Sequence, residues 1–398
     1  MLLPRPLSIP QEIISTILNE LSSDTDSLKR CSLVSQSFLP HCHKLLFSYI
    51  CLDHPTRSRG LYDLITNNTT FIPYIRKVDI ISIAGSSSRD RDCVIFEDTL
   101  APLLQTLRNL HAFSLREQGW RNLLWSKLPA DLRSTILNLT VTSITLENLR
   151  NVPMGHFGRF VCLKNLRLVD MEWDCEIPLE LEPLGASFSS PQGPTGYLES
   201  LGIVDSAMCG RHLITTLTDP RSSLKLSRLK ELDLSGNHGN HGFAGTIMEA
   251  AGQSLQRVVW FDFGEEINPH PNPFTRVPSS FSALPALRFL TIHTQFACGR
   301  ACDPLPPLAQ ALAGATPRDA CALEHLKIDI DFYCISNDVD IIDKYALWPA
   351  LDQALARPGV YTELKRVEIS LMCDDCREAF AGLSKRRMPM LVEKGVFY

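Results

Sequence analysis

One spacing of apolar residues recurs ten times after residue 75: an apolar residue, two variable residues, an apolar residue, one variable residue and a third apolar residue. The last two members of each triple alternate as in a short strand with one buried side, and the first lies on the turn leading into that strand. Segments long enough for a helix lie between triples, for example 246–251 and 307–313. The sequence therefore predicts strand-then-helix units stacked into a parallel sheet. The triples are Ile75/Val78/Ile80, Leu110/Phe113/Leu115, Val141/Ile144/Leu146, Leu163/Leu166/Leu168, Leu198/Leu201/Ile203, Leu229/Leu232/Leu234, Leu255/Val258/Trp260, Leu287/Leu290/Ile292, Leu323/Leu326/Ile328 and Leu364/Val367/Ile369.

The triple that begins at Leu229 continues as Leu-Lys-Glu-Leu-Asp-Leu-Ser-Gly-Asn and resembles a leucine-rich repeat, Leu-x-x-Leu-x-Leu-x-x-Asn. We expect the amide of Asn237 to satisfy backbone groups of neighbouring turns. Successive triples start 22 to 41 residues apart, against ~20–29 in regular repeats. The resemblance therefore implies an irregular horseshoe with variable helices and loops on its convex side. The alternative is an ordinary α/β domain, although doubly wound strands have longer continuous apolar runs.

The first 50 residues predict three short helices. Ser8 and Gln11 have the spacing of a capping box, and Pro10 lies in the first helical turn, where its missing N–H costs nothing. Asp24 and Asp26 are candidate N-caps for a second helix, and Pro40 allows a third that continues through Tyr49. Three helices this short cannot bury their apolar residues alone. The apolar stripe of the first helix comprises Ile13, Ile14, Ile17, Leu18 and Leu21.

The order of residue types across residues 8–47 resembles an F-box, with Ile9-Pro10 in place of the usual Leu-Pro and Phe38 in place of the usual tryptophan. The resemblance implies that the three-helix unit docks on a small adaptor subunit, which bridges to a cullin scaffold. The alternative is an N-terminal cap that packs on the domain behind it. The resemblance further implies that one set of residues divides between the core of the unit and the adaptor contact: Ile9, Pro10, Ile13, Ile17, Leu18, Leu28 and Val34.

An F-box followed by irregular leucine-rich repeats makes the whole chain similar to the large F-box families of mushroom-forming fungi. We predict an α/β protein with an F-box at 5–52, a linker at 53–74 containing a short helix near 61–65, and a leucine-rich-repeat domain at 75–398. Stretches rich in Ser, Pro or Gly predict loops at 86–92, 182–196 and 268–273.

Composition indicates an intracellular protein of the cytoplasm or nucleus. The net charge of −5 argues against a general nucleic-acid surface. The sequence has neither the start of a signal peptide nor an apolar run of 18 residues, so we predict no membrane partner. The 13 cysteines follow no framework spacing and are better read as reduced core residues than as disulfides.

Candidate catalytic and metal-binding motifs are few. Cys373 and Cys376 form one Cys-x-x-Cys pair, but no second pair completes a zinc site. The segment 236–242 lacks the Lys-Ser/Thr of a phosphate-binding loop, and His41-Cys42-His43 lies within the predicted helices. Neither a Gly-x-Ser-x-Gly elbow nor a His-Glu-x-x-His helix occurs. We therefore predict no enzyme activity, cofactor or metal.

Two neighbouring triples differ from the others in the residues that flank their buried pair. Most copies place polar residues there, but these two place aromatic and aliphatic ones, so adjacent strands would carry an apolar group rimmed by Arg and His. We predict a target-binding surface there, and the alternative is that a loop at 265–276 covers it. The residues are Arg257, Val259, Phe261, Phe289, Thr291 and His293.

These features predict the substrate-recruiting subunit of a cullin-type ubiquitin ligase, in which the F-box binds the adaptor and the repeats hold a protein target near the transferred ubiquitin. One alternative is a leucine-rich-repeat scaffold that binds partners without directing ubiquitination. A second is an enzyme whose site lies hidden among the loops.

Overall fold

The computed structural model describes residues 9–83, 93–119, 122–173, 194–236, 242–263, 281, 284–297, 305–315, 322–333, 348–371, 382–383 and 385–397. The chain packs as two units, Met1–Arg150 and Asn151–Tyr398. The predicted limits of the F-box and linker remain predictions.

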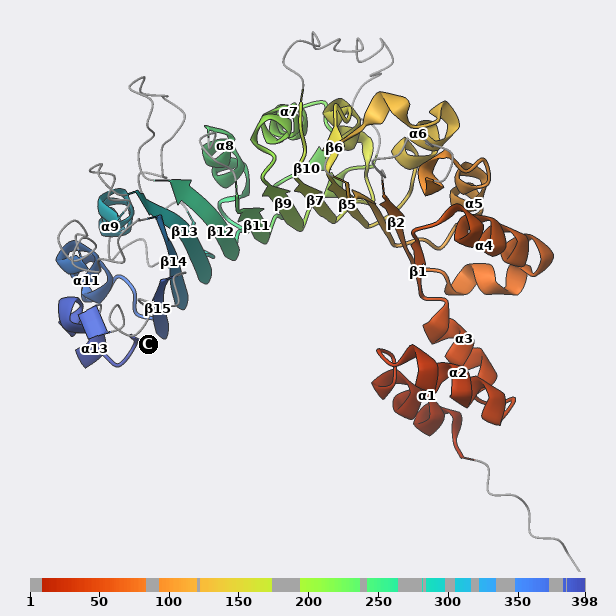
Figure 1. Cartoon of the computed structure of the whole chain (residues 1–398). Coiled ribbons are helices and arrows are strands. Elements are labelled where there is room, and N and C mark those ends of the chain that lie inside the picture. The colour runs from red at the N-terminus through yellow and green to blue at the C-terminus, as the bar shows by residue number, and fades with distance from the viewer. Residues whose placement is uncertain are drawn as a thin grey trace, which may run out of the picture. The chain divides into compact units, whose positions relative to one another are not determined.

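The first unit starts with three helices and continues with parallel strands (Figure 1). Its main ladder has the order β1-β2-β3-β5, and β4 pairs with β6. Helices α4, α5 and α6 pack against one another in sequence along one face of the strands (Figure 1). The elements are α1 (Gln11–Glu20), α2 (Thr25–Val34), α3 (Leu39–Leu46), β1 (Tyr49–Leu52), α4 (Pro55–Asn67), η1 (Thr69–Tyr74), β2 (Lys77–Ser82), η3 (Val94–Phe96), α5 (Leu100–Thr106), β3 (Ala112–Glu117), β4 (Leu123–Leu124), η4 (Trp125–Lys127), α6 (Ala130–Leu137), β5 (Ser143–Glu147) and β6 (Leu149–Arg150).

The helix starts and ends of this unit test the sequence-based predictions. Asp24 caps α2 as predicted, because its carboxylate accepts the Ser27 amide at 3.0 Å. The predicted capping box involves Ser8, which lies outside the described residues. The predicted third helix is too long: α3 ends at Leu46, and Tyr49 begins strand β1. The short helix predicted in the linker is part of α4.

Strand β1 is an eleventh copy of the apolar spacing, formed by Phe47, Ile50 and Leu52. The carbonyl oxygen of Ser48 accepts the first amides of the next copy, as the corresponding carbonyls do further along the chain. Tyr49 also donates its hydroxyl to Asp79 on β2 at 3.0 Å. The chain therefore leaves the helix at residue 47 because pairing with β2 satisfies its backbone.

The second unit continues the strand-then-helix alternation. Its main ladder has the order β7-β9-β11-β12-β13-β14-β15, all parallel, and β8 pairs with β10. Helices α7, α8, α9 and α11 lie along one face (Figure 1); we call the other side the strand face. The elements are η5 (Met154–Arg159), β7 (Asn165–Val169), β8 (Gly196–Tyr197), β9 (Ser200–Val204), α7 (Ala207–Thr218), β10 (Leu224–Lys225), β11 (Glu231–Leu234), α8 (Gly242–Ala251), β12 (Arg257–Phe263), β13 (Phe289–Ala297), α9 (Leu305–Ala313), β14 (His325–Tyr333), α11 (Trp348–Ala356), β15 (Arg366–Leu371) and α13 (Pro389–Glu393).

All ten predicted triples lie in the core. Each of their thirty residues is at most 8% exposed, and every triple has its last two members on a strand of a main ladder. The predicted helical segments at 246–251 and 307–313 lie in α8 and α9. The protein is therefore an α/β solenoid of the leucine-rich-repeat type, with N-terminal helices. No helix in the described part of the chain is long and apolar enough to cross a membrane.

Four consecutive repeats turn out of their strand through a left-handed residue at one equivalent position. The residues are Asn148, Asp170, Asp205 and Gly236, with φ between 48° and 74°. Short polar residues and glycine tolerate this conformation best. Asn148 also donates its side-chain amide to the carbonyl of Glu117 at 2.9 Å. That is the role predicted for Asn237, which lies outside the described residues.

The last strand is covered at its outer edge by the C-terminal segment. Val367 on β15 forms a parallel bridge to Phe397, and its amide donates to the carbonyl of Val396 at 2.7 Å. The buried carboxylate of Asp352 accepts the amides of Met390 and Leu391, both at 3.0 Å. These contacts protect an edge strand whose backbone would otherwise be free to pair.

Candidate protein-binding surfaces

The three N-terminal helices enclose a small core. Ile14 and Leu18 from α1 meet Leu28 from α2 and Cys42 from α3, and all four side chains are buried. Partly buried side chains pack around them: Leu21, Cys31, Phe38, Leu45 and Leu46. Two of the residues predicted to share the adaptor contact, Leu18 and Leu28, therefore belong to the core of the unit.

The rest of that predicted set lies at the surface. Ile9 is 54% exposed, Ile13 51% and Ile17 50%, and the three recur at a spacing of four residues. Ile13 and Ile17 therefore lie on one side of α1, and Ile9 lies two residues before the helix begins. Val34 is 72% exposed at the end of α2, and its neighbour Leu33 is 87% exposed. We call Ile9, Ile13, Ile17, Leu33 and Val34 the apolar helix face; Pro10, also predicted, is exposed beside it.

Two side-chain contacts connect α1 to the residues that follow α2. Gln11 donates its amide to the carbonyl of Ser37 at 3.1 Å, just beyond the end of α2. Ser15 lies 3.3 Å from the Nδ1 atom of His41 on α3. The start of α1 therefore contacts the segment between α2 and α3, and α3 itself. Leu33 was not among the residues predicted to contact the adaptor. It does not share the helical spacing of Leu28 and Cys31, and this difference could have indicated that it faces away from the core.

The predicted target-binding residues lie on the neighbouring strands β12 and β13. The register places Arg257 beside Phe289, Val259 beside Thr291, and Phe261 beside His293. The backbone of Phe261 is in β12, but its side chain lies outside the described residues. The predicted juxtaposition of the two strands is thus confirmed, and its role in binding remains a prediction.

Neighbouring side chains contact both sides of the Phe289 ring, whereas the sequence suggested an exposed apolar group. The Arg257 guanidinium lies 4.8 Å from the ring centroid, a cation–π arrangement. On the other side, the His325 ring stacks on Phe289 with 5.1 Å between centroids and 12° between planes. Phe289 is therefore the middle of an Arg–Phe–His row across β12, β13 and β14.

Two carboxylates on the strand face of the second unit are held by cations. Arg167 reaches across β9 to Asp233 at 2.9 Å, and it can do so because Gly202, between them, has no side chain. Asp329 is buried and lies 2.8 Å from Lys327 and 3.4 Å from His293. The pairs are charge-assisted and fix these side chains in place.

A second row of charges runs along the edge where the strands begin. Its members follow the first apolar residue of each triple of the second unit, and each member after the first donates its backbone amide to the carbonyl of the preceding member at 2.7–2.9 Å. We call this series the start row: Lys164, Glu199, Lys230, Gln256, Arg288, Glu324 and Lys365. Sequence reasoning missed it, although aligning the triples would have revealed it.

Both glutamates of the start row bridge two cations. Glu199 lies 3.0 Å from Lys230 and 3.0 Å from Lys164, and these hydrogen bonds lower the pKa of its carboxyl group. Glu324 pairs with Arg288 and, at 2.7 Å, with Lys365, which together lower its pKa to about 2. Both groups are therefore firmly ionised at neutral pH.

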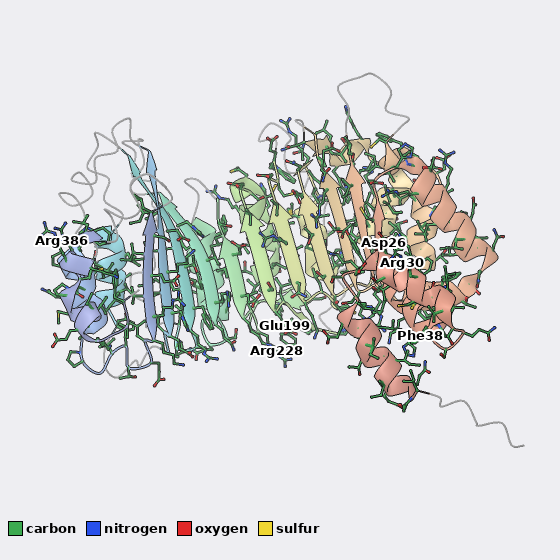
Figure 2. All side chains as sticks on the ribbon, turned by 60° about the horizontal axis from the view of Figure 1, so that its bottom comes forward. Asp26, Arg30, Phe38, Glu199, Arg228 and Arg386 are labelled. Atoms are coloured by element: carbon green, nitrogen blue, oxygen red, sulfur yellow. The ribbon has the colours of Figure 1, made fainter. Side chains whose placement is uncertain are left out.

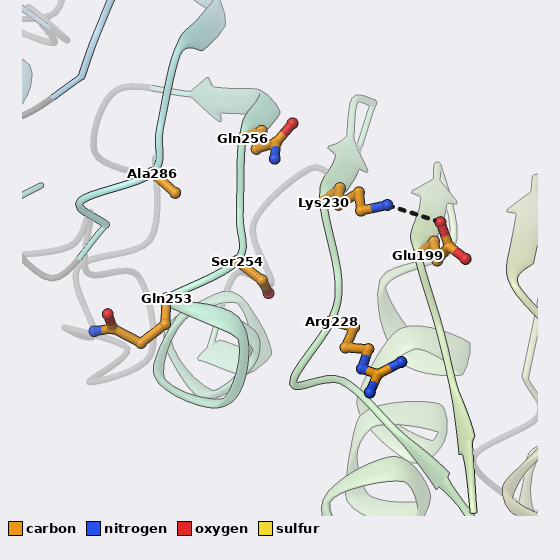
Figure 3. Close-up of a pocket in the computed structure, with 7 residues that line it drawn as sticks. All are labelled: Glu199, Arg228, Lys230, Gln253, Ser254, Gln256 and Ala286. Carbon is orange, nitrogen blue, oxygen red and sulfur yellow. Dashed lines mark hydrogen bonds and ion pairs between the residues drawn. The ribbon is translucent and has the colours of Figure 1, made fainter.

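Between these two clusters lies a pocket of about 260 Å³. Figure 2 shows Glu199 and Arg228 at the edge of the sheet where the strands begin, and Figure 3 shows Lys230 turned toward Glu199. Arg228 stacks on the ring of Tyr197 at 4.0 Å and has no carboxylate partner among the described residues. The pocket is lined by Glu199, Arg228, Lys230, Gln253, Ser254, Gln256 and Ala286.

The other candidate motifs are either packed in the N-terminal helices or lie outside the described residues. Cys42 is buried in the helical core, and His43 packs against Phe47 and Phe71. Cys373 and Cys376 lie outside the described residues. Within the described ranges, no three His, Cys, Asp or Glu side chains are grouped so that they could hold a metal ion.

Comparison with known proteins gives no family assignment, because no protein-family model and no curated protein matches the chain.

Proposed function

We propose that this protein is an F-box subunit that recruits protein targets to a cullin-type ubiquitin ligase. In this proposal the three N-terminal helices bind the adaptor and the repeats hold the target. The chain itself performs no chemistry, and it acts by raising the concentration of the target near the transferred ubiquitin.

The observation that carries the proposal is the apolar helix face. The three-helix unit is small, yet it leaves five large aliphatic side chains about half exposed or more, while a separate set fills its core. Burying such side chains stabilises an interface by about 25 cal/mol per Å² of apolar area. An exposed group of this kind is typical of a surface that another protein covers. The sequence pattern that resembles an F-box contains the same helices, and this gives the covering partner an identity: the adaptor.

The strand face of the second unit supports the other half of the proposal. Two of its carboxylates, Asp233 and Asp329, are held by ion pairs, and the Arg–Phe–His row lies across three adjacent strands. Aromatic and arginine side chains are enriched in the residues that dominate protein interfaces. A fixed polar face with an aromatic centre is suited to hold a protein target.

The direct test is to mix the purified full chain with the purified adaptor of a cullin ligase and to measure complex formation by size-exclusion chromatography with light scattering. We expect a stable complex of one chain and one adaptor. Absence of a complex at micromolar concentrations would refute the proposal. A complex that never changes the lifetime of any captured protein would favour the second candidate, a leucine-rich-repeat scaffold.

A further inference from the structure

The start row of the second unit has a gap in its alternation of charge. From β7 to β11 its side chains are basic, acidic and basic, and from β13 to β15 they are again basic, acidic and basic. The position between the two clusters, directly before β12, carries the neutral Gln256. Its neighbours in the row are Lys230 and Arg288, so a carboxylate here would lie between two cations, as Glu199 and Glu324 do.

The pocket described above lies at this gap. Gln256 and Gln253 contribute amide groups to its lining, and neither side chain has a hydrogen-bond partner among the described residues. Figure 3 shows them on the side of the pocket opposite Arg228. Neighbouring parallel strands are about 4.8 Å apart, so side chains of consecutive members of the row can reach one shared group.

Arg228 is the strongest recognition element in the pocket. Its guanidinium carbon lies 4.0 Å from the centroid of the Tyr197 ring, a cation–π contact that restrains the side chain. Glu199, the one carboxylate in the lining, already accepts from two lysines. The pocket therefore combines a cation without an acidic partner and two amide side chains with free donors.

We propose that this pocket binds an acidic side chain, Asp or Glu, of the protein target. The carboxylate of the target would accept a hydrogen bond from the Gln256 amide and complete the alternation of the start row between Lys230 and Arg288, and Arg228 would attract it from the opposite side of the pocket. Gln256 immediately precedes Arg257, so the acidic side chain would be held next to the Arg–Phe–His row. The inference rests on the proposed function in one respect, that the repeats hold a protein target.

The test uses the full-length chain and a library of decapeptides that are random except for one fixed central residue. Four versions of the library carry Glu, Gln, phosphoserine or Lys at that position, and the bound fraction of each is measured. We expect the Glu library to be retained about tenfold more than the Gln library, because a charge-assisted pair with arginine replaces a neutral contact. Equal retention of these two libraries, or enrichment of the phosphoserine library alone, would overturn the assignment.

Three variants sharpen the test. Gln256→Glu supplies the missing carboxylate from the chain itself, so it should fold normally and lose the preference for Glu peptides; Arg228→Ala should lose it too. The matched control is Gln353→Glu, the same change at an exposed position of α11, which should keep the preference. Retention of the preference in Gln256→Glu would refute the inference.

The proposed adaptor contact is read out separately. Ile13→Asp should bind the Glu library as the wild-type chain does, whatever its effect on adaptor binding. Loss of adaptor binding with retained peptide preference, or the reverse, thus shows which of the two proposals has failed.

Discussion

Replacing Ile13 by aspartate separates adaptor binding from folding. Ile13 is 51% exposed and lies in the first turn of α1, where a negative charge is favourable to the helix dipole. Removing the contacts of the half-buried Ile13 side chain lowers the free energy of unfolding by about 1 kcal/mol, and the interaction of aspartate with the helix dipole offsets part of this loss. We therefore expect the free energy of unfolding to fall by no more than about 1 kcal/mol.

The cost to binding is larger. An adaptor that covers the exposed half of Ile13 gains about 1 kcal/mol from its burial. Aspartate loses this gain, and desolvating its carboxylate in an apolar interface costs at least ~2 kcal/mol more. The sum of ~3 kcal/mol corresponds to binding at least about 100-fold weaker.

Calorimetric titration with the adaptor measures the affinity, and amide hydrogen exchange over α1–α3 reports whether the helices remain folded. Asn19→Asp is the matched control, because this exposed position lies about 120° around α1 from Ile13; it should bind normally. Ile14→Asp, at a buried position, should instead unfold the three helices. Affinity of Ile13→Asp within threefold of wild type would refute the reasoning.

Three further changes test the repeats. Gly236→Ala should lower stability in urea denaturation by roughly 2 kcal/mol, since its φ is 74° and a Cβ atom would lie 2.3 Å from the Asp205 carboxylate; an unchanged midpoint would contradict the described turn. Glu324→Gln should lower the urea midpoint at pH 7, because the ionised carboxylate is paired with two cations in the folded state. The difference in midpoint between variant and wild type should shrink as pH falls from 4.5 toward about 2, where the wild-type carboxylate becomes protonated. A difference independent of pH would contradict the ion pairs of Glu324. Phe261→Ala combined with Phe289→Ala should abolish target capture in affinity purification with adaptor binding intact, and full capture would move the target site elsewhere.

The strand positions were predictable because each triple has two constraints, period-two burial on the strand and a fixed turn before it. The copy at Phe47, Ile50 and Leu52 escaped notice because Leu45 and Leu46 continue a helical spacing up to it. Local propensity favoured the helix, and pairing with β2 decides against it.

The division of the α1 stripe could not be derived from sequence. Ile13, Ile14, Ile17 and Leu18 span a wide arc of the helix, and only the positions of α2 and α3 determine that Ile14 and Leu18 are buried. The left-handed turns are different, since Asn148, Asp170 and Asp205 occupy one aligned position and could have been read from the triples.

The most direct test of the central claim is a comparison of captured proteins in cells that make the wild-type chain or the Ile13→Asp variant. This variant is preferable to a deletion of residues 1–52, which would remove β1 from its ladder. Affinity purification with mass spectrometry should recover the adaptor and cullin with the wild type alone and the same target proteins with both, and those targets should have longer lifetimes in cells that make the variant. Equal recovery of the adaptor with both chains, or unchanged target lifetimes, would contradict the account.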